Sequence, residues 1–378
     1  MRPLSSVQVS RPFRRPDRRQ SFATLETPGM AAPGAPSLTR PPTRRRWPRI
    51  LGWVGASLGL LALGTFVVFQ VSPWPSALLI RYAFDKGGVE TNEKLAPLVP
   101  SDVTSMTDVP YRTDNPAALL DVHRPASASG SLPTVVWTHG GGWVSGSKEQ
   151  VANYAKIVAG HGYTVVAIDY SIAPGATYPT PVIELNDALA YVIEHADELG
   201  VDPGRIVLAG DSAGSQISAQ VANAVTSPVY AEELGIEPAI SPDELVAVLL
   251  HCGAYDMSLV DTSKGGASSW FLETVLWSYS GTKDFAADPR FAPASVANHV
   301  TEEFPPAFLT GGNADPLTPQ GRAMAARLTE VGVEVDAIFQ PEGEEPGLGH
   351  EYQFDLSTEA GQVALDRSLE FLAKHTYR

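Results

Sequence analysis

The residue with the clearest chemical potential in this sequence is Ser212, the middle residue of a Gly-Asp-Ser-Ala-Gly pentapeptide at 210–214. The mostly apolar run at 205–209 is typical of a buried strand, and residues 216–222 have the composition of a helix. A strand that turns sharply into a helix through G-x-S-x-G exposes a serine hydroxyl for nucleophilic attack. The glycines on either side leave room for the strained backbone of such a turn.

The pentapeptide is informative only because of what surrounds it. A second match to G-x-S-x-G, at 55–59, lies inside a long apolar run with no strand before it. A motif of this kind is a hypothesis until its structural context agrees. Only the copy that contains Ser212 has a strand before it and a helix after it.

A glycine-rich segment earlier in the chain predicts a site that binds an oxyanion. Residues 133–138 are typical of a buried strand and are followed by His-Gly-Gly-Gly-Trp at 139–143. Consecutive glycines after a strand allow backbone N–H groups to point inward with no side chain in the way. Such donors stabilise the negative charge that develops when a serine attacks a carbonyl carbon.

A serine hydroxyl also needs a base, and His350 is the histidine in the expected place. In this architecture the order along the chain is Ser, then Asp or Glu, then His. His350 follows the expected last strand, at 333–339, and precedes the expected last helix. The other seven histidines precede Ser212, lie in expected helices, strands or loops away from this position, or belong to the C-terminal tail.

Two aspartates are candidates for the acid that orients the base. Asp315 follows a short strand at 306–310, directly before the strand that leads to His350, and Asp256 follows the strand at 245–250. An aspartate before a helix is also a common N-cap, which is the structural alternative for Asp315. We favour Asp315, which would hold the imidazole in one tautomer and stabilise the imidazolium.

Together these motifs resemble the hormone-sensitive-lipase-like esterases of the α/β-hydrolase fold over residues 106–378. The segments 139–142 and 210–214 match the HGGG and GDSAG of that group, 169–174 resembles its DYRLAP, and 315–317 its DPL. The resemblance implies a catalytic triad of Ser212, Asp315 and His350. The same resemblance implies that the backbone N–H groups of Gly141, Gly142 and Ala213 donate hydrogen bonds to the oxyanion.

The sequence departs from the usual motifs of this group at a few positions. Ser171 stands where the group usually has Arg, and Glu351-Tyr352 replaces the usual Gly-Phe after the histidine. Trp143, after the glycines, resembles feruloyl-esterase-like and acetyl-esterase-like relatives. These departures leave the triad intact and concern the choice of substrate.

The alternation of apolar strands with helices predicts one large α/β domain. We expect an α/β-hydrolase fold with a mostly parallel eight-stranded sheet, helices on both faces and a small cap. Cap segments are expected at 72–105 and 257–300; the latter holds Trp270, Phe271, Leu276, Trp277 and Tyr279. The strands expected from the sequence lie near 117–122, 133–138, 163–168, 205–209, 245–250, 306–310 and 333–339, and the helices near 149–160, 183–198, 213–225, 318–331 and 359–374.

A membrane anchor is expected before this domain. Residues 50–71 carry no charged side chain, and at about 1.5 Å per residue a helix of this length crosses a hydrocarbon core of about 30 Å. A cleaved signal peptide is the closest alternative, but it would need an unusually long N-terminal region and apolar core. Arginines on the N-terminal side predict a single span with a cytoplasmic N-terminus and an extracytoplasmic catalytic domain, at the cell membrane.

Charge is divided sharply along the chain. Residues 1–49 hold 11 arginines and two acidic residues, whereas the remainder holds 16 basic and 40 acidic residues. The tail is expected to be disordered and cytoplasmic, with its arginines near anionic lipid or acting only as a topology signal. The acidic remainder excludes nucleic acid as a partner and disfavours polyanionic substrates. The G-x-x-x-G at 55–59 allows a homodimer through the span.

No cofactor and no metal site are expected. The single cysteine, Cys252, cannot form an intrachain disulfide and is expected to be a buried packing residue. The sequence has no CxxC and no HExxH. The leading hypothesis is a membrane-anchored serine carboxylesterase that hydrolyses small uncharged esters with short or medium acyl groups. The alternatives are an amidase, peptidase or carbohydrate deacetylase with the same triad, or a non-catalytic binding module on the same fold.

Overall fold

The computed structural model describes residues 34, 47–263 and 265–377, in two compact units, Met1–Leu58 and Gly59–Arg378. The boundary between the units falls within helix α1 (Trp47–Val71). Apart from residues 34 and 47–49, the Arg-rich tail predicted at 1–49 lies outside the described residues. The elements that carry the predicted site residues all belong to the second unit, which is described below.

Helix α1 contains the segment predicted to span a membrane. Within the described part of the chain, Arg49–Val71 is the one helix that is long and apolar enough for this, and its apolar stretch is not buried. Length and composition of this kind suit a membrane anchor or a signal sequence.

The predicted sheet of eight strands, mostly parallel, is confirmed. The strand order is β1-β2-β4-β3-β5-β6-β7-β8; β2 runs antiparallel to both β1 and β4, and all later pairs are parallel. Parallel pairing brings the carboxyl ends of the central strands to one edge, where a site can form. The strands are β1 (Val103–Pro110), β2 (Leu119–Pro125), β3 (Leu132–Thr138), β4 (Thr164–Ile168), β5 (Val201–Asp211), β6 (Leu245–His251), β7 (Ala307–Gly311) and β8 (Val335–Phe339).

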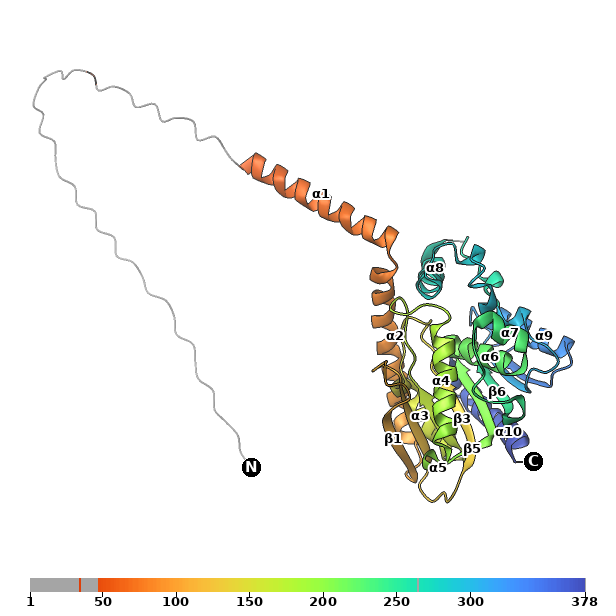
Figure 1. The fold of residues 1–378 in the computed structure, drawn as a ribbon. Helices are drawn as coiled ribbons and strands as arrows, with labels where there is room; N and C mark the ends of the chain where they lie inside the picture. The colour runs from red at the N-terminus through yellow and green to blue at the C-terminus, as the bar shows by residue number, and fades with distance from the viewer. Residues whose placement is uncertain (1–33, 35–46, 264, 378) are drawn as a thin grey trace, which may run out of the picture. The chain divides into compact units, whose positions relative to one another are not determined.

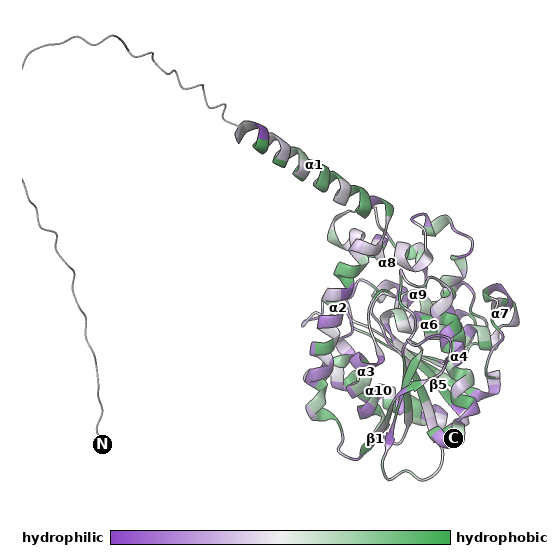
Figure 2. Ribbon diagram, turned by 60° about the vertical axis from the view of Figure 1, so that its left-hand side comes forward, coloured by the Kyte–Doolittle hydropathy of each residue, from purple (hydrophilic) through white to green (hydrophobic). Residues whose placement is uncertain are grey.

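Helices cover both faces of the sheet, as Figure 1 shows. Alternate residues of β3 belong to two different cores. Val136 lies in the core that includes residues of α4, α6 and α9, and Val135 and Trp137 lie in the core that includes residues of α3 and α10. Apolar residues accordingly concentrate along the central strands and the helix faces against them (Figure 2). The helices of this unit besides the end of α1 are α2 (Trp74–Leu95), α3 (Lys148–Ala159), α4 (Thr180–Glu194), α5 (Ala196–Leu199), α6 (Ser212–Thr226), α7 (Pro228–Leu234), α8 (Gly266–Ser280), α9 (Thr318–Glu330) and α10 (Glu359–Thr376).

Four elements, β1, α2, α7 and α8, were not among the strands and helices expected from the sequence. Strand β1 is an edge strand with mostly exposed side chains and a register shift between Met106 and Val109, so it lacks the apolar run of a buried strand. Helices α2 and α8 fall within the segments expected only as caps. They pack against each other through Phe84 and Phe271, whose ring centroids are 5.4 Å apart.

The turn from β5 into α6 depends on two close backbone contacts. Ser212, the first residue of α6, has φ 51°. A Cβ on Gly210 would lie 2.6 Å from the carbonyl carbon of Gly214, and a Cβ on Gly214 would collide with the carbonyl oxygen of Thr138 at the end of β3. Glycine is therefore required at both positions for the helix to start this close to the sheet.

We expect Gly214→Ala to lower the free energy of unfolding by about 3 kcal/mol or more, because the added methyl group meets rigid backbone. Urea unfolding of the full chain in detergent, followed by tryptophan fluorescence, measures this change. Gly204→Ala is the matched control: the nearest atom to its added Cβ would be 3.5 Å away, in the Asp202 side chain. Equal stability of the two variants would contradict the steric argument.

Candidate functional site

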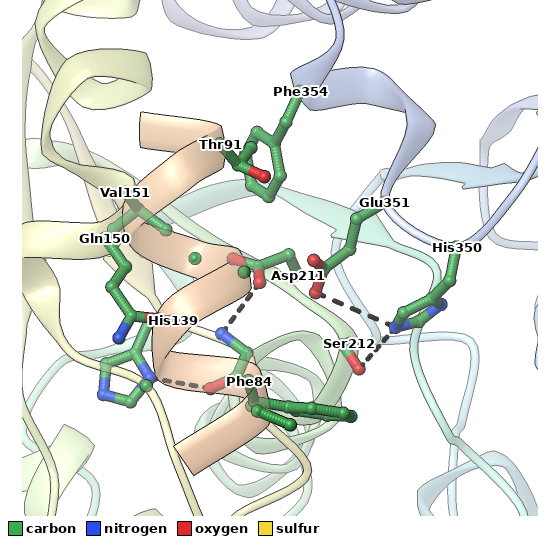
Figure 3. A pocket seen from close by; sticks show the side chains of 16 residues that line it. Phe84, Thr91, His139, Gln150, Val151, Asp211, Ser212, His350, Glu351 and Phe354 are labelled. Atoms are coloured by element: carbon green, nitrogen blue, oxygen red, sulfur yellow. Dashed lines mark hydrogen bonds and ion pairs between the residues drawn. The ribbon is translucent and has the colours of Figure 1, made fainter. Parts of the chain in front are cut away.

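Ser212 and His350 lie within hydrogen-bonding distance of each other. The Nε2 atom of His350 is 2.9 Å from Oγ of Ser212, as Figure 3 shows. The Ser212 side chain is presented by the strained turn described above, and Ser212 is only 7% exposed. A positive φ in a residue other than glycine is costly, and such strain is found preferentially at functional sites. The nucleophile and base expected from the sequence therefore lie close enough for a proton to pass between them.

The acid preferred from the sequence also reaches the histidine. Oδ2 of Asp315 lies 3.0 Å from Nδ1 of His350, and its Oδ1 accepts a hydrogen bond from the backbone N–H of Leu317. Asp315 is almost fully buried, directly after β7. The alternative acid, Asp256, instead accepts hydrogen bonds from Ser258 at the start of a short 3₁₀ helix.

The surroundings of His350 favour its protonated form. Removal from water would by itself lower its pKa, but the neighbouring Cys252, the Asp315 carboxylate and Glu351 outweigh this and raise the pKa well above its ordinary value. Its side chain is one third exposed, so water and substrate can reach it. A base whose cation is stabilised in this way takes up a proton readily.

The glycine loop lies beside the serine. Gly141 lines the same cavity as Ser212 and has φ 105°, and Gly142 has φ 60°. Both values lie in the region that glycine adopts at little cost. Ala213 is the second residue of α6 and follows Ser212 directly, whereas Gly142 is not among the residues that line the cavity with Ser212.

Two buried side chains hold this loop in place. Neither was predicted from the sequence to be a site residue. Oδ2 of Asp211 accepts a hydrogen bond of 2.8 Å from the N–H of Gly140, and Oδ1 accepts another of 2.8 Å from the indole of Trp137. The hydroxyl of Tyr170 donates to the carbonyls of His139 and Gly140, at 3.2 and 3.3 Å. Asp211 belongs to the pentapeptide itself, so the nucleophile turn and the glycine loop are linked by one carboxylate.

Helix α2 forms one wall of the cavity and contributes Ala83, Phe84, Gly87, Gly88 and Thr91. The cavity has a volume of about 320 Å³. This wall follows one stripe of the helix, because residues three or four apart lie on the same side. The five large apolar residues expected in the 257–300 cap are not among those that line the cavity; Leu276 and Tyr279 are core residues instead.

Helix α2 is also fixed to the segment that follows the oxyanion glycines. Nε of Arg81 donates to the carbonyl of Val144 over 2.7 Å. Oδ1 of Asp85 accepts hydrogen bonds from the Ser145 hydroxyl at 2.6 Å and from the Gly146 N–H at 3.3 Å. The short polar side chains and paired glycines of α2 gave no strong helical periodicity, which is why the sequence did not reveal this role.

One side chain of the site departs from the family pattern. Glu351 follows the histidine directly, has φ 60° and lines the cavity. Its Oε1 lies 3.7 Å from Nε2 of His350 (Figure 3). The sequence showed that a glutamate replaces the usual glycine at this position. It did not show that the glutamate side chain points into the cavity.

One group of side chains within the described part of the chain has ligand atoms close enough to hold a metal ion. The atoms of Cys252, Asp315 and His350 lie within 4.8 Å of one another. The histidine is already shared between Ser212 and Asp315, and burial raises the pKa of the Cys252 thiol. A protonated thiol is a poor metal ligand, so the arrangement fits proton transfer better than metal binding.

Comparison with known proteins agrees with this geometry. Residues 135–353 match the family model described as alpha/beta hydrolase fold. The carboxylesterase NlhH of Mycobacterium tuberculosis is 32% identical over 276 residues, which cover 71% of this chain and 79% of that protein. The esterase LipC of the same organism is 32% identical over 248 residues, covering 64% and 58% of the two chains.

Solved structures show the same fold at lower identity. Esterase B from Lactobacillus rhamnosis superimposes with a TM-score of 0.66 at 22% identity, over 79% of this chain and 96% of that one. An esterase of Pyrobaculum calidifontis gives a TM-score of 0.62 at 24% identity, over 79% and 93%. The chain therefore belongs to the α/β-hydrolase fold family, in the carboxylesterase group that its motifs resemble.

Proposed function

We propose that this protein is a membrane-anchored serine carboxylesterase with Ser212, His350 and Asp315 as its triad. The observation that carries the proposal is the chain of contacts from Oγ of Ser212 to His350, at 2.9 Å, and from His350 to Asp315, at 3.0 Å. Nucleophile, base and orienting acid stand in the order and at the distances that acyl transfer requires. The relatives named carboxylesterase and esterase support the choice of esters.

The reaction proceeds in two halves. Nε2 of His350 takes the proton of Ser212 as Oγ attacks the ester carbonyl, and the N–H groups of Gly141, Gly142 and Ala213 stabilise the oxyanion. His350 then gives the proton to the leaving alcohol, which leaves an acyl group on Ser212. Water, activated by the same histidine, hydrolyses this acyl-enzyme and restores the serine.

The cavity supports small substrates with short or medium acyl groups. Its volume is about 320 Å³, and Ala83, Phe84, Val151 and Phe354 supply an apolar part of its lining. The excess of acidic residues after residue 49 disfavours esters that carry negative charge. An ester without anionic groups therefore fits best.

The proposal places the enzyme outside the cytoplasm on a single uncleaved span. Residues 50–71 lack charged side chains, and four arginines, Arg44, Arg45, Arg46 and Arg49, precede them closely. Positive charge on the N-terminal side favours a cytoplasmic N-terminus.

Ser212→Ala is expected to abolish labelling by a fluorophosphonate probe and to lower hydrolysis of p-nitrophenyl butyrate by about 10⁴-fold or more, because no other hydroxyl reaches His350 at this position. Gel fluorescence and a spectrophotometric assay measure the two effects. Ser57→Ala, in the second G-x-S-x-G, is the control and should behave as the native protein does. Full labelling of a folded Ser212→Ala variant would refute the assignment.

Asp315→Asn is expected to reduce kcat by about 10³- to 10⁴-fold, because the amide cannot hold the imidazole tautomer or stabilise its cation. The same change removes a charge that raises the pKa of His350. Since the base acts in its neutral form, the acid limb of kcat/KM should lie above pH 6.5 in the native enzyme and move to lower pH in the variant. A pH series of p-nitrophenyl butyrate hydrolysis checks both points, with Asp256→Asn as the control that leaves rate and limb unchanged.

The full chain is expected to remain with membranes after an alkaline carbonate wash, because its apolar span stays in the bilayer. A chain that starts at residue 72 should leave them. External protease should digest the catalytic domain in spheroplasts of a bacterial host. If expression of the full-length sequence yields a shorter, soluble protein, the apolar segment is a cleaved signal sequence instead.

A further inference from the structure

We propose that Glu351 makes this enzyme selective for esters whose alcohol portion carries a positive charge. The inference rests on the proposed function and narrows it, from esters without anionic groups to esters of amino alcohols. Four features of the site support it: the backbone of Glu351, the way its carboxyl is held, its position relative to the leaving group, and the charges around it.

The backbone at Glu351 is held in a costly conformation. Its φ of 60° lies in the left-handed region, where a residue with a Cβ is less stable than glycine by about 1 kcal/mol. The related esterases resembled by this sequence usually have glycine after the histidine, which would carry no such cost. The chain nevertheless places a glutamate here, with a side chain that is 34% exposed and lines the cavity.

The carboxyl of Glu351 is held in place by Asp211. Both oxygens of Asp211 already accept N–H groups, from Trp137 and Gly140, so this side chain is fixed. A Cβ on Gly140 would touch both Oδ2 of Asp211 and Oε1 of Glu351, so the two carboxyl groups lie side by side. Burial and the charge of Glu351 raise the pKa of Asp211 well above its ordinary value, so Asp211 is the member that takes up a proton and the pair keeps one negative charge.

That charge lies on the side of the departing alcohol. Oε1 of Glu351 is 3.7 Å from Nε2 of His350, the atom that hands its proton to the leaving oxygen. A substituent a few bonds beyond the leaving oxygen therefore passes close to the Glu351 carboxylate.

Among the residues that the structure describes, neither lysine nor arginine lines this cavity to compensate the charge; Lys94 lines the adjoining cavity, which Glu351 also borders. The ionisable residues that line the first cavity are Asp211, Glu351, His139 and His350. Burial lowers the pKa of His139 to about 4, so it is neutral at pH 7. At the pH of maximal kcat/KM, His350 is neutral because the base acts in that form. The cavity then holds a carboxylate with no cation beside it in the cavity, which attracts cations and repels anions.

Two esters that differ only in charge test the inference. Butyrylcholine and 3,3-dimethylbutyl butyrate have the same shape, with a quaternary nitrogen in one and a carbon in the other. Both give the same butyryl-enzyme, so the ratio of their kcat/KM values reports the formation of that intermediate alone. Acid release in a pH-stat, with the full chain in detergent at the pH of maximal kcat/KM, measures both.

We expect the native enzyme to favour butyrylcholine by about tenfold or more in kcat/KM, the effect of one close charge pair. Glu351→Gln keeps the size of the side chain and removes its charge, so the ratio should fall to about threefold or less. Glu342→Gln, an exposed position in the same connection between β8 and His350, removes an equal charge outside the cavity. That variant should keep the native ratio.

The outcomes separate this inference from the proposed function. If the native enzyme hydrolyses p-nitrophenyl butyrate but shows a ratio near one, or does not hydrolyse butyrylcholine, the role of Glu351 is refuted and the esterase stands. If Glu351→Gln keeps the native ratio, the selectivity has another source and the inference is likewise refuted. If the native enzyme hydrolyses no ester and Ser212 is not labelled by a fluorophosphonate, the proposed function itself fails.

Discussion

The close approach of helix α6 to the end of strand β3 is the constraint on which the site depends. The carbonyl of Thr138 occupies the space that a side chain at 214 would need, so the helix can approach the strand this closely only with a glycine as its third residue. This contact sets the height of Ser212 above the sheet and brings it beside the glycine loop that leaves β3. Asp211 then ties the turn to that loop through the N–H of Gly140. The order of the parallel strands delivers Asp315 and His350 to the same edge.

Much of this arrangement could be predicted from the sequence, because it depends on short-range rules. Apolar runs followed by glycine or aspartate marked the strands that end at the site, and the chain order of Ser212, Asp315 and His350 fits one architecture. The choice of Asp315 over Asp256 rested on strand order, and the structure gives Asp256 a local capping role instead. These features are visible because each is encoded within a few residues.

The remaining features depend on contacts between distant segments. Helix α2 has a weak apolar pattern, because it packs through Arg81 and Asp85 on one loop and through small residues on the cavity. Strand β1 is exposed and interrupted by a register shift, so no apolar alternation marks it. The direction of Glu351 follows from a positive φ and from Asp211, more than a hundred residues earlier, neither of which a local pattern encodes.

The position of α2 has a consequence for how this enzyme would meet its substrates. Ala83, the first cavity residue of α2, is only 12 residues after Val71, the last residue of the apolar helix. Most of this segment is helical, and a helix of 12 residues spans only about 18 Å. If the apolar helix lies in a bilayer, the cavity is therefore tethered to a thin layer at its surface. The rate at which the enzyme meets an ester then depends on how strongly the ester partitions into that layer. Enzyme and ester diffuse toward each other in two dimensions, along the membrane surface. An ester with an apolar acyl chain and a polar or charged alcohol would accumulate there at low bulk concentration.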